Sequence, residues 1–354
     1  MRMIYEQDSE HLNPGAQQLE FIWLELTSRC NLNCVHCYAE SSPHPQTPDT
    51  LVTQDYFNLL DSAASLGCRK VQFIGGEPTI VKELPDFIVH ARHRGFEFIE
   101  VYTNATRISE QLLSCFVQNE VAVATSFYSD KSEVHDAITQ KPGSHRLTAN
   151  TIQRLIDAGL SVRVGIIVMD ENRDGVDRTI DYLHSLGVTD VGIDRVRSFG
   201  RGSSITDGDS SLSELCGACW QGSLCVSSNG TVSPCIMSKD WSVGSTIEKE
   251  LGELAQSQKL REIRTRIYQE VWLPQSQHHS GQYGPPDMGN GVDYKSACNP
   301  DCRPNCEPAC NPRCSPNCSP CYPSGKCNPE LFCGPCGPDK KKYKPTALNV
   351  QQYV

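Results

Sequence analysis

The sequence predicts an α/β fold: a partial (β/α)6 TIM-like barrel followed by a cysteine-rich C-terminal region. Strand-like segments alternate with helix-like segments up to Asp194, and this alternation is typical of right-handed βαβ units and a parallel sheet. Six strand-like segments precede that residue, fewer than the eight units of a closed barrel. Most of the 19 cysteines lie beyond residue 210, where the alternation has ended.

The expected strands are short and mainly apolar, and most end at polar residues or glycine. Val71–Ile74 has the composition of a buried strand and runs into Gly75-Gly76. The six segments are Phe21–Leu26, Val71–Ile74, Phe98–Tyr102, Val121–Phe127, Ser161–Met169 and Asp190–Asp194.

The helix-like segments carry apolar residues at helical spacing. Ser109 precedes one of them as a predicted N-cap, and Gly67 follows another at the position of a C-cap. The expected helices are Asp55–Leu66, Leu84–Arg94, Ser109–Gln118, Leu147–Ala158 and Gly175–Leu186.

Changes in composition predict five parts of the chain. Phe199–Asp209 is rich in Gly and Ser and is expected to be a linker. Thr246–Glu270 has helical character, and Pro274–Pro286 is expected to be a loop. The parts are an N-terminal extension (1–20), the barrel (21–198), the linker with a first cysteine-rich region (199–297), a Cys/Pro-rich region (298–339) and a tail (340–354).

The composition limits the class of protein. A net charge of −10 argues against a nucleic-acid-binding protein, because phosphate recognition requires clustered Lys and Arg. No apolar stretch is long enough to span a bilayer, and residues 1–18 lack the apolar segment of a signal peptide. We therefore expect a cytoplasmic protein that does not contact a membrane. A reducing compartment keeps thiols reduced, so dense cysteines there indicate metal binding.

Three cysteines, Cys30, Cys34 and Cys37, directly follow the first expected strand. They lie on a loop at the carboxyl end of a parallel strand, where the chemistry of such folds takes place. Iron–sulfur clusters are held by cysteine thiolates, and three thiolates leave one iron of a [4Fe–4S] cluster open to a further ligand. A zinc site formed by the three cysteines and His36 is the alternative.

The spacing Cys-x3-Cys-x2-Cys after the first strand resembles the radical SAM superfamily, over about Phe21–Asp194. The resemblance implies that Cys30, Cys34 and Cys37 hold a [4Fe–4S] cluster whose open iron chelates S-adenosylmethionine. It also implies that one electron from the cluster breaks the sulfur–C5′ bond and yields a 5′-deoxyadenosyl radical. His36 matches the family position that lies beside the adenine.

Two glycines and a glutamate follow the second expected strand. Gly75 and Gly76 permit close backbone approach to a ligand, although an ordinary tight turn is the alternative. About forty residues after the cysteines, the segment resembles the family's Gly-Gly-Glu motif. The resemblance implies that Glu77 and its neighbours accept hydrogen bonds from the amino group of S-adenosylmethionine.

Polar residues near the ends of the next strands are the remaining candidates for cofactor contacts. Thr103 and Asn104 are expected near the ribose, with strand-ending turn residues as the alternative. The resemblance implies that Ser126 and Arg163 contact the ribose and the carboxylate of S-adenosylmethionine. Three arginines after the sixth strand are expected either to bind an anionic group or to be surface charges: Arg195, Arg197 and Arg201.

A second group of four cysteines lies beyond the barrel. Their spacing is Cys216-x2-Cys219-x5-Cys225-x9-Cys235, which suffices for one complete metal site, and a zinc ribbon is the alternative. Val226–Val232 contains Asn-Gly and predicts a β-hairpin that brings Cys225 and Cys235 to the same end. Together with the first motif, this group resembles the SPASM or twitch extension, which implies an auxiliary [4Fe–4S] cluster.

A third group begins with a four-residue repeat, Cys298–Cys314, that has proline at each third place. Proline disfavours regular helix and central strand, so turns are expected, and no role is assigned to the repeat. The cysteines that follow resemble the SPASM pattern, although Leu331 occupies the place of one expected cysteine. The resemblance implies a possible second auxiliary cluster whose candidate ligands are Cys318, Cys321, Cys327, Cys333 and Cys336.

Auxiliary clusters indicate that an electron leaves the substrate after hydrogen abstraction, which suits oxidative modification. Many SPASM relatives modify ribosomally synthesised peptides, so the resemblance implies a peptide maturase. The alternatives are radical oxidation, epimerisation or decarboxylation of a small metabolite such as a sugar or nucleoside, and an iron–sulfur or metal carrier without turnover. Expected partners are an electron donor such as flavodoxin or ferredoxin and a separate leader-peptide-binding protein.

Overall fold

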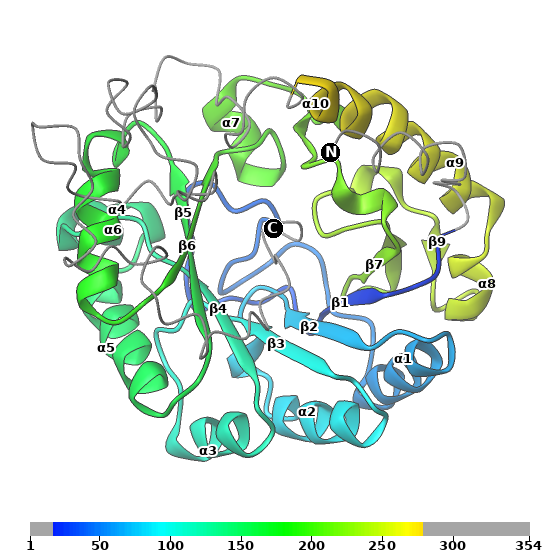
Figure 1. Cartoon of the computed structure of the whole chain (residues 1–354), viewed down its shortest axis with the longest axis horizontal. Coiled ribbons are helices and arrows are strands. Elements are labelled where there is room, and N and C mark those ends of the chain that lie inside the picture. The colour runs from blue at the N-terminus through cyan, green and yellow to red at the C-terminus, as the bar shows by residue number, and fades with distance from the viewer. Residues whose placement is uncertain (1–16, 279–354) are drawn as a thin grey trace, which may run out of the picture. The chain divides into compact units, whose positions relative to one another are not determined.

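The structure, a computed structural model, describes residues 17–278 of the 354-residue chain. The chain divides into two compact units, residues 1–274 with 351–354 and residues 275–350. The sheet and all the helices except the end of α10 belong to the first unit (Figure 1). None of the helices in the described range combines the length and the apolar character that crossing a membrane requires.

One mixed sheet organises the first unit. Within residues 17–278 it has nine strands in the order β6-β5-β4-β3-β2-β1-β7-β8-β9. Strands β1 to β6 pair in parallel in sequence order, β7 adds to β1 in parallel, and β8 and β9 follow antiparallel. The bounds are β1 Phe21–Glu25, β2 Lys70–Ile74, β3 Phe98–Tyr102, β4 Ala122–Ser126, β5 Val162–Val168, β6 Asp190–Arg195, β7 Ser223–Val226, β8 Thr231–Ser233 and β9 Gly244–Ser245.

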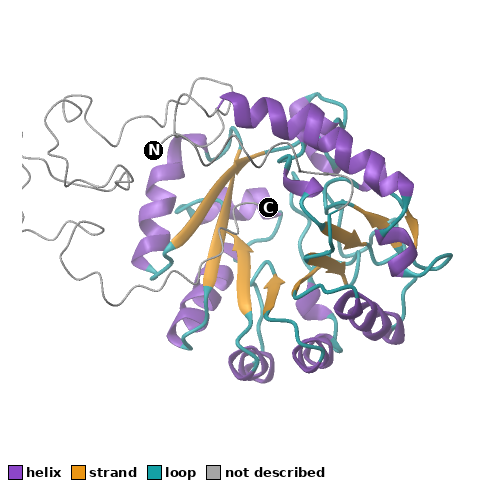
Figure 2. Ribbon diagram, turned by 45° about the vertical axis from the view of Figure 1, so that its right-hand side comes forward, coloured by secondary structure: helices purple, strands orange, loops and turns teal. Residues whose placement is uncertain are grey.

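The sheet curves into an open barrel with helices on its outer side (Figure 2). Strands β6 and β9 are its two ends and do not pair with each other, which confirms the predicted partial barrel. The helices are α1 Thr53–Ser65, α2 Leu84–His93, α3 Glu110–Gln118, α4 Ser132–Thr139, α5 Ser144–Asp157, α6 Val176–Ser185, α7 Ser203–Thr206, α8 Leu251–Ala255, α9 Gln258–Ile267 and α10 Leu273–His278.

The core and the inner surface of the barrel use alternate residues of the same strands, because successive side chains of a strand point to opposite faces. Leu24, Phe73 and Val101 are neighbours in register, and all three are fully buried in the main apolar cluster. Gln72 and Glu100, which pair with each other in register, occupy the opposite face. The outer face of the sheet thus forms the apolar core, and the inner face carries polar groups.

Local expectations are largely confirmed. All six expected strands form within two residues of their predicted ends, and the Ser109 hydroxyl accepts a hydrogen bond from Leu112 N at 3.2 Å as an N-cap. The hairpin is also confirmed, because β7 and β8 pair antiparallel with Cys225 opposite Ser233. Helix α4 is present but was not expected from the sequence.

Two expectations for irregular segments are wrong. Phe199–Asp209 is not a plain linker, because it contains the 3-10 turn Gly200–Gly202 and helix α7. A loop was expected at Pro274–Pro286, but residues 274–278 belong to helix α10. The rest of that segment lies outside the described residues.

Candidate metal centre

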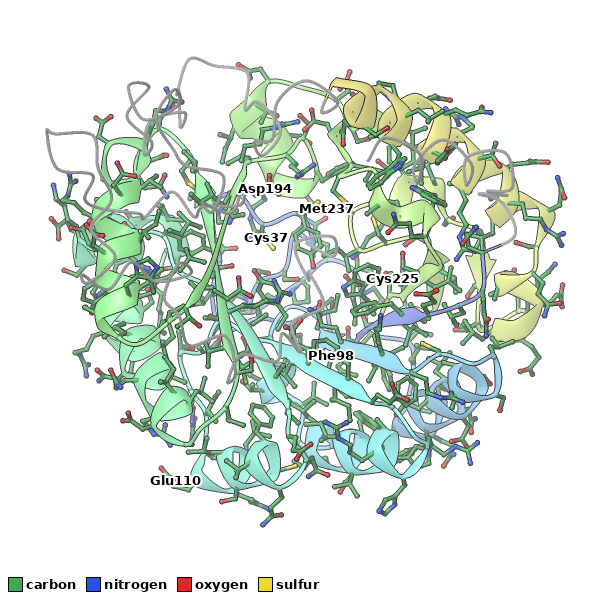
Figure 3. All side chains as sticks on the ribbon, viewed as in Figure 1. Cys37, Phe98, Glu110, Asp194, Cys225 and Met237 are labelled. Carbon is green, nitrogen blue, oxygen red and sulfur yellow. The ribbon has the colours of Figure 1, made fainter. Side chains whose placement is uncertain are left out.

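The loop with Cys30, Cys34 and Cys37 follows β1 at the carboxyl edge of the parallel strands. Cys30 is buried, and the other two thiols are half-buried. Neighbouring segments hold the loop backbone: Cys30 N donates to Ser42 O at 2.9 Å, and Val35 N donates to Ile138 O at 3.0 Å at the end of α4. Figure 3 shows Cys37 inside the ring of strands, whereas Glu110 lies on its outer rim.

Amide donors surround the first of the three thiols. Leu32 N lies 3.4 Å from Cys30 Sγ, and Asn104 Nδ2 lies 3.7 Å from the same atom. Burial nevertheless raises the pKa of both Cys30 and Cys34 to about 12, assisted by the Glu77 charge for Cys30 and by the neighbouring thiols for Cys34. These thiols are therefore protonated at neutral pH, and a metal has to displace their protons to bind.

The donor chemistry of this loop fits an iron–sulfur cluster. Three soft sulfur ligands lie on one loop, and N–H groups point at one of them, as is common where thiolates carry charge. Within residues 17–278, no group of three or more His, Cys, Asp or Glu side chains already has metal-holding geometry. His36 packs edge-on against Tyr128, with ring centroids 5.0 Å apart.

The glycines after β2 make a close contact with the cysteine loop. Gly76 N donates to Thr27 O at 2.7 Å, and Glu77 N donates to Arg29 O at 2.9 Å. A Cβ atom on Gly76 would lie 2.1 Å from Arg29 O, so only glycine fits here. The sequence predicts that these glycines approach a ligand closely. In the described structure, they approach the backbone that precedes Cys30.

Glu77 lies at the centre of a buried hydrogen-bond network. Its Oε1 accepts from Thr79 N at 3.0 Å and from the hydroxyls of Thr79 and Thr103 at 2.6 Å, and its Oε2 accepts from Asn104 N at 2.7 Å. Burial raises the pKa of the Glu77 carboxyl, which these hydrogen bonds partly offset. Thr103 and Asn104 thus hold Glu77 in place, and Asn104 links it to Cys30.

Ser126 and Arg163 also have partners inside the barrel. Ser126 Oγ lies 2.9 Å from Tyr102 Oη. The guanidinium of Arg163 binds both carboxylate oxygens of Glu100, at 2.8 and 2.9 Å, and lies 5.5 Å from the centroid of the Tyr102 ring. Gln72 also donates to Glu100. The assignment of Ser126 and Arg163 to S-adenosylmethionine remains a prediction.

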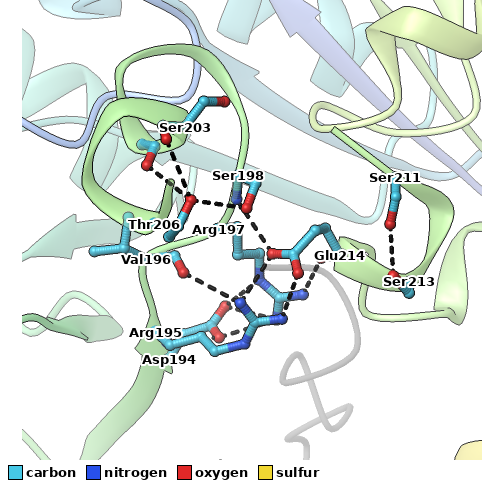
Figure 4. Close-up of polar contacts among 11 residues, drawn as sticks. Asp194, Arg195, Val196, Arg197, Ser198, Ser203, Thr206, Ser211, Ser213 and Glu214 are labelled. Carbon is cyan, nitrogen blue, oxygen red and sulfur yellow. Dashed lines mark hydrogen bonds and ion pairs between the residues drawn. The ribbon is translucent and has the colours of Figure 1, made fainter. Parts of the chain in front are cut away.

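The three arginines at the end of β6 and just beyond it have separate roles. Arg195 forms an ion pair with Glu214 at 2.8 Å, and Arg197 forms one with Asp194 at 2.9 Å and donates to the Glu214 carbonyl (Figure 4). Arg201 instead binds the cysteine loop, where its Nε donates to Cys34 O at 2.8 Å. Sequence reasoning missed this contact, because nothing local to Arg201 indicates a partner 167 residues away.

The second cysteine group lies around β7 and β8. Hydrogen bonds to Cys216 and Cys235, together with burial, raise the pKa of Cys219 well above its usual value. The bond from Cys219 lowers the pKa of Cys216 to about 7. Cys225 is fully buried on β7 beside Trp23 of β1. The third group, Cys298 to Cys336, lies outside the described residues.

Two further charged residues belong to this region. Lys239 pairs with Glu25 at 2.8 Å, and Glu25 ends the strand that leads into the cysteine loop. Arg264 is 1% exposed and donates to the carbonyls of Gln17 and Ser223, each at 3.0 Å. Burial lowers the pKa of Arg264 to about 10. Both cations lie close enough to cysteines to affect them electrostatically: Lys239 near Cys225 and Arg264 near Cys219.

An open parallel barrel with three thiols at the mouth and a second thiol group on an added hairpin defines a class of iron–sulfur α/β-barrel protein. Comparison with known families agrees. Residues 24–183 match the radical SAM superfamily, and residues 216–278 match the iron–sulfur cluster-binding domain called SPASM. Residues 24–183 therefore form a radical SAM domain, and residues 216–278 form a SPASM domain. These domains imply [4Fe–4S] clusters and S-adenosylmethionine as cofactors.

Among curated proteins, the chain is 33% identical over 187 residues to the antilisterial bacteriocin subtilosin biosynthesis protein AlbA of Bacillus subtilis, covering 51% of this chain and 40% of AlbA. It is 26% identical over 193 residues to Fe-coproporphyrin III synthase of Methanosarcina barkeri, covering 54% and 48%. The chain thus spans less than half of these relatives. The fold resembles Streptococcus suis SuiB bound to precursor peptide SuiA, with a TM-score of 0.57 and 14% identity over 70% of this chain and 67% of SuiB.

Proposed function

We propose that this chain reductively cleaves S-adenosylmethionine to a 5′-deoxyadenosyl radical and uses that radical to modify a substrate oxidatively. The observation that carries the proposal is the loop of three thiols at the carboxyl edge of the barrel, docked on the Gly75–Glu77 segment. Cys30, Cys34 and Cys37 would hold a [4Fe–4S] cluster. That cluster, when present, supplies the electron for cleavage.

The chain's own residues support and orient this site. The amide groups of Leu32 and Asn104 stabilise negative charge on the Cys30 sulfur. Burial and the charge of Arg201 lower the pKa of His36 to about 4, so its ring is neutral at pH 7. Its Nδ1 is buried without a partner among the described residues, which suits a hydrogen bond to a bound adenine.

For the substrate, we propose a ribosomally synthesised peptide. Two of the similar proteins are named for peptides: AlbA for subtilosin biosynthesis and the SuiB structure for its precursor SuiA. The sheet does not close between β6 and β9, an arrangement that suits a long substrate. A separate leader-binding protein and an external electron donor, flavodoxin or ferredoxin, complete the proposal. The nine cysteines within residues 17–278 are free thiols, which suits the reducing cytoplasm.

Modification of a small metabolite is the second candidate, because one similar protein is named as a porphyrin-forming synthase. The arginines after β6 do not favour it. Arg195 and Arg197 are already bound to Glu214 and Asp194, and Arg201 is bound to loop carbonyls. Two of the three guanidinium groups in this cluster are therefore neutralised by carboxylates, and the third is held by the cysteine loop.

Cleavage can be tested with the full chain, reconstituted anaerobically with iron and sulfide and incubated with S-adenosylmethionine and dithionite. We expect 5′-deoxyadenosine by mass spectrometry, with at least a hundredfold loss in Cys30→Ala. Cys115→Ala is the matched control, because that thiol is half-buried on helix α3, away from the loop. A metal carrier would produce no 5′-deoxyadenosine in any of the three proteins, and that result would reject the enzyme proposal.

A further inference from the structure

Arg201 makes three contacts with the cysteine loop. Its Nε donates to Cys34 O at 2.8 Å, its Nη2 donates to Ser41 O at 2.8 Å, and its backbone N donates to Cys37 O at 3.0 Å. Arg201 alone therefore contacts the cysteine loop at three points, from Cys34 through Cys37 to Ser41. A guanidinium suits this task, because its rigid fork can bind two carbonyls at fixed separation.

Gly200 brings the two segments together. Its φ of +52° lies in the left-handed region, and a Cβ atom here would lie 2.4 Å from Tyr38 O and 2.7 Å from Cys37 O. Real Cβ contacts are never this short, and both atoms belong to the backbone, which cannot move aside cheaply. Any side chain at position 200 would push Arg201 away from the loop.

The charge of Arg201, unlike that of Arg195 and Arg197, is not neutralised by a carboxylate among the described residues. Arg195 and Arg197 each form an ion pair with a carboxylate. Within residues 17–278, Arg201 has carbonyl partners but forms no ion pair. Its positive charge therefore remains beside the cysteine loop, with its Nε 2.8 Å from Cys34 O.

We propose that Gly200 and Arg201 form a clamp that positions the cysteine loop and places a fixed positive charge beside the cluster that the loop would hold. Arg201 is a positioning residue, because it touches the loop backbone and not the reacting atoms. The inference rests on the proposed cluster only for its electrostatic part. The mechanical part, in which the clamp orders the loop, holds for the protein without metal.

The two parts predict separate effects. Loss of the Arg201 side chain frees the carbonyls of Cys34 and Ser41 from their donors, so the amides of residues 30–42 should exchange with solvent faster even in metal-free protein. Loss of the charge makes reduction of a nearby cluster harder, since reduction adds negative charge. We expect the equilibrium constant for reduction to fall about tenfold, which corresponds to roughly 59 mV for one electron.

The test uses the full chain with Arg201→Met, Arg201→Lys and, as a control on the same segment, Arg195→Met. In metal-free protein, the amides of residues 30–42 should exchange at least tenfold faster than in the wild type in both Arg201 variants. Their exchange should be unchanged in the control. A redox titration of the reconstituted protein, followed by the electron paramagnetic resonance signal that S-adenosylmethionine shifts, should show a lower potential in Arg201→Met. Lysine should restore the potential, because it keeps the charge.

Gly200→Ala serves as a second variant that keeps the arginine. It should accelerate exchange over the same residues, whereas Gly252→Ala should not, because a Cβ there meets only Leu66 at an ordinary 3.7 Å. Unchanged exchange in both Arg201→Met and Gly200→Ala would overturn the clamp. If the wild type gave no signal that responds to S-adenosylmethionine, the proposed function would fail, while the exchange result would still decide the mechanical part.

Discussion

The two cysteine groups of the described chain are held in different ways. The thiols of the first group lie on an open loop, and other segments support them: amide donors from Leu32 and Asn104, and backbone contacts to the Gly75–Glu77 turn and to Arg201. In the second group, Cys219, Cys225 and Cys235 are buried, and Cys219 bonds to two other cysteines.

This difference indicates different tasks. A loop held by its backbone leaves two of its thiols, Cys34 and Cys37, half-buried and so within reach of a ligand. A buried thiol group on a hairpin is shielded from ligands and suits a structural or electron-carrying role. The first region therefore supplies the reactive site and the second a protected one, and this contrast can be tested.

The largest expected effect separates the two groups by function. Cys37→Ala should lower the cleavage of S-adenosylmethionine at least a hundredfold, because the loop has no other thiol to replace it. The Cys219→Ala variant should bind about four fewer irons per chain, the content of one [4Fe–4S] cluster, yet retain measurable cleavage. Iron analysis and 5′-deoxyadenosine measurement of both variants check this. Equal loss of cleavage in both would show that the groups do not have separate tasks.

A smaller effect concerns the support of the second group. Arg264→Met keeps much of the apolar stem but removes two hydrogen bonds to the buried carbonyls of Gln17 and Ser223. Each bond from a charged donor contributes about 1.5–3 kcal/mol, so loss of the two should lower the free energy of unfolding in urea by roughly 3–6 kcal/mol. Arg261→Met, on the exposed side of α9, is the control and should change stability little. A loss in Arg264→Met no larger than that of the control would mean that this buried cation is not structural.

The smallest effect is a pH dependence confined to the first region. Helix α4, which accepts hydrogen bonds from Asn33 and Val35, contains the buried His135. Burial and His145 lower the pKa of His135 from 6.5 to about 3. The unfolded chain therefore binds a proton that the folded chain does not, and stability present above pH 6.5 is lost as the pH falls toward 3. Residues 215–272 contain no histidine.

At pH 5 this linkage amounts to about 2 kcal/mol, because each pH unit below the unfolded pKa costs roughly 1.4 kcal/mol. His135→Asn keeps an acceptor for Tyr128 N, which the ring now supplies at 3.3 Å. Between pH 7.5 and pH 5, the urea midpoint of unfolding should fall less in the variant than in the wild type. Parallel falls in the two proteins would assign the acid sensitivity to other groups.

Much of the fold follows from local sequence patterns. The apolar runs of β1 to β6 locate the strands, and Ser109 and the Asn229-Gly230 turn locate a helix start and a hairpin. Helix α4 was missed because it is short and two of its three buried side chains, His135 and Thr139, are polar. The parallel pairing of β7 with β1 was missed because no local pattern encodes which strand becomes a neighbour.

The same distinction applies to the site. The three thiols and the Gly75–Glu77 segment can be predicted because their spacing is a local pattern. The roles of Gly76, Asn104 and Arg201 cannot, because each depends on what the chain brings opposite it: Arg29, Cys30 and Cys34. Long-range contacts of this kind are decided by packing and not by residue type.

The pairing of Phe21 on β1 with Ser223 on β7 has a consequence for synthesis. On the ribosome, β1 emerges early, but one side of its backbone has no partner until about two hundred residues later. At roughly 5–20 residues per second, that interval lasts about 10–40 s. During this time the nascent chain exposes an apolar strand edge next to its reactive thiols, which makes it a natural client for chaperones that shield such edges.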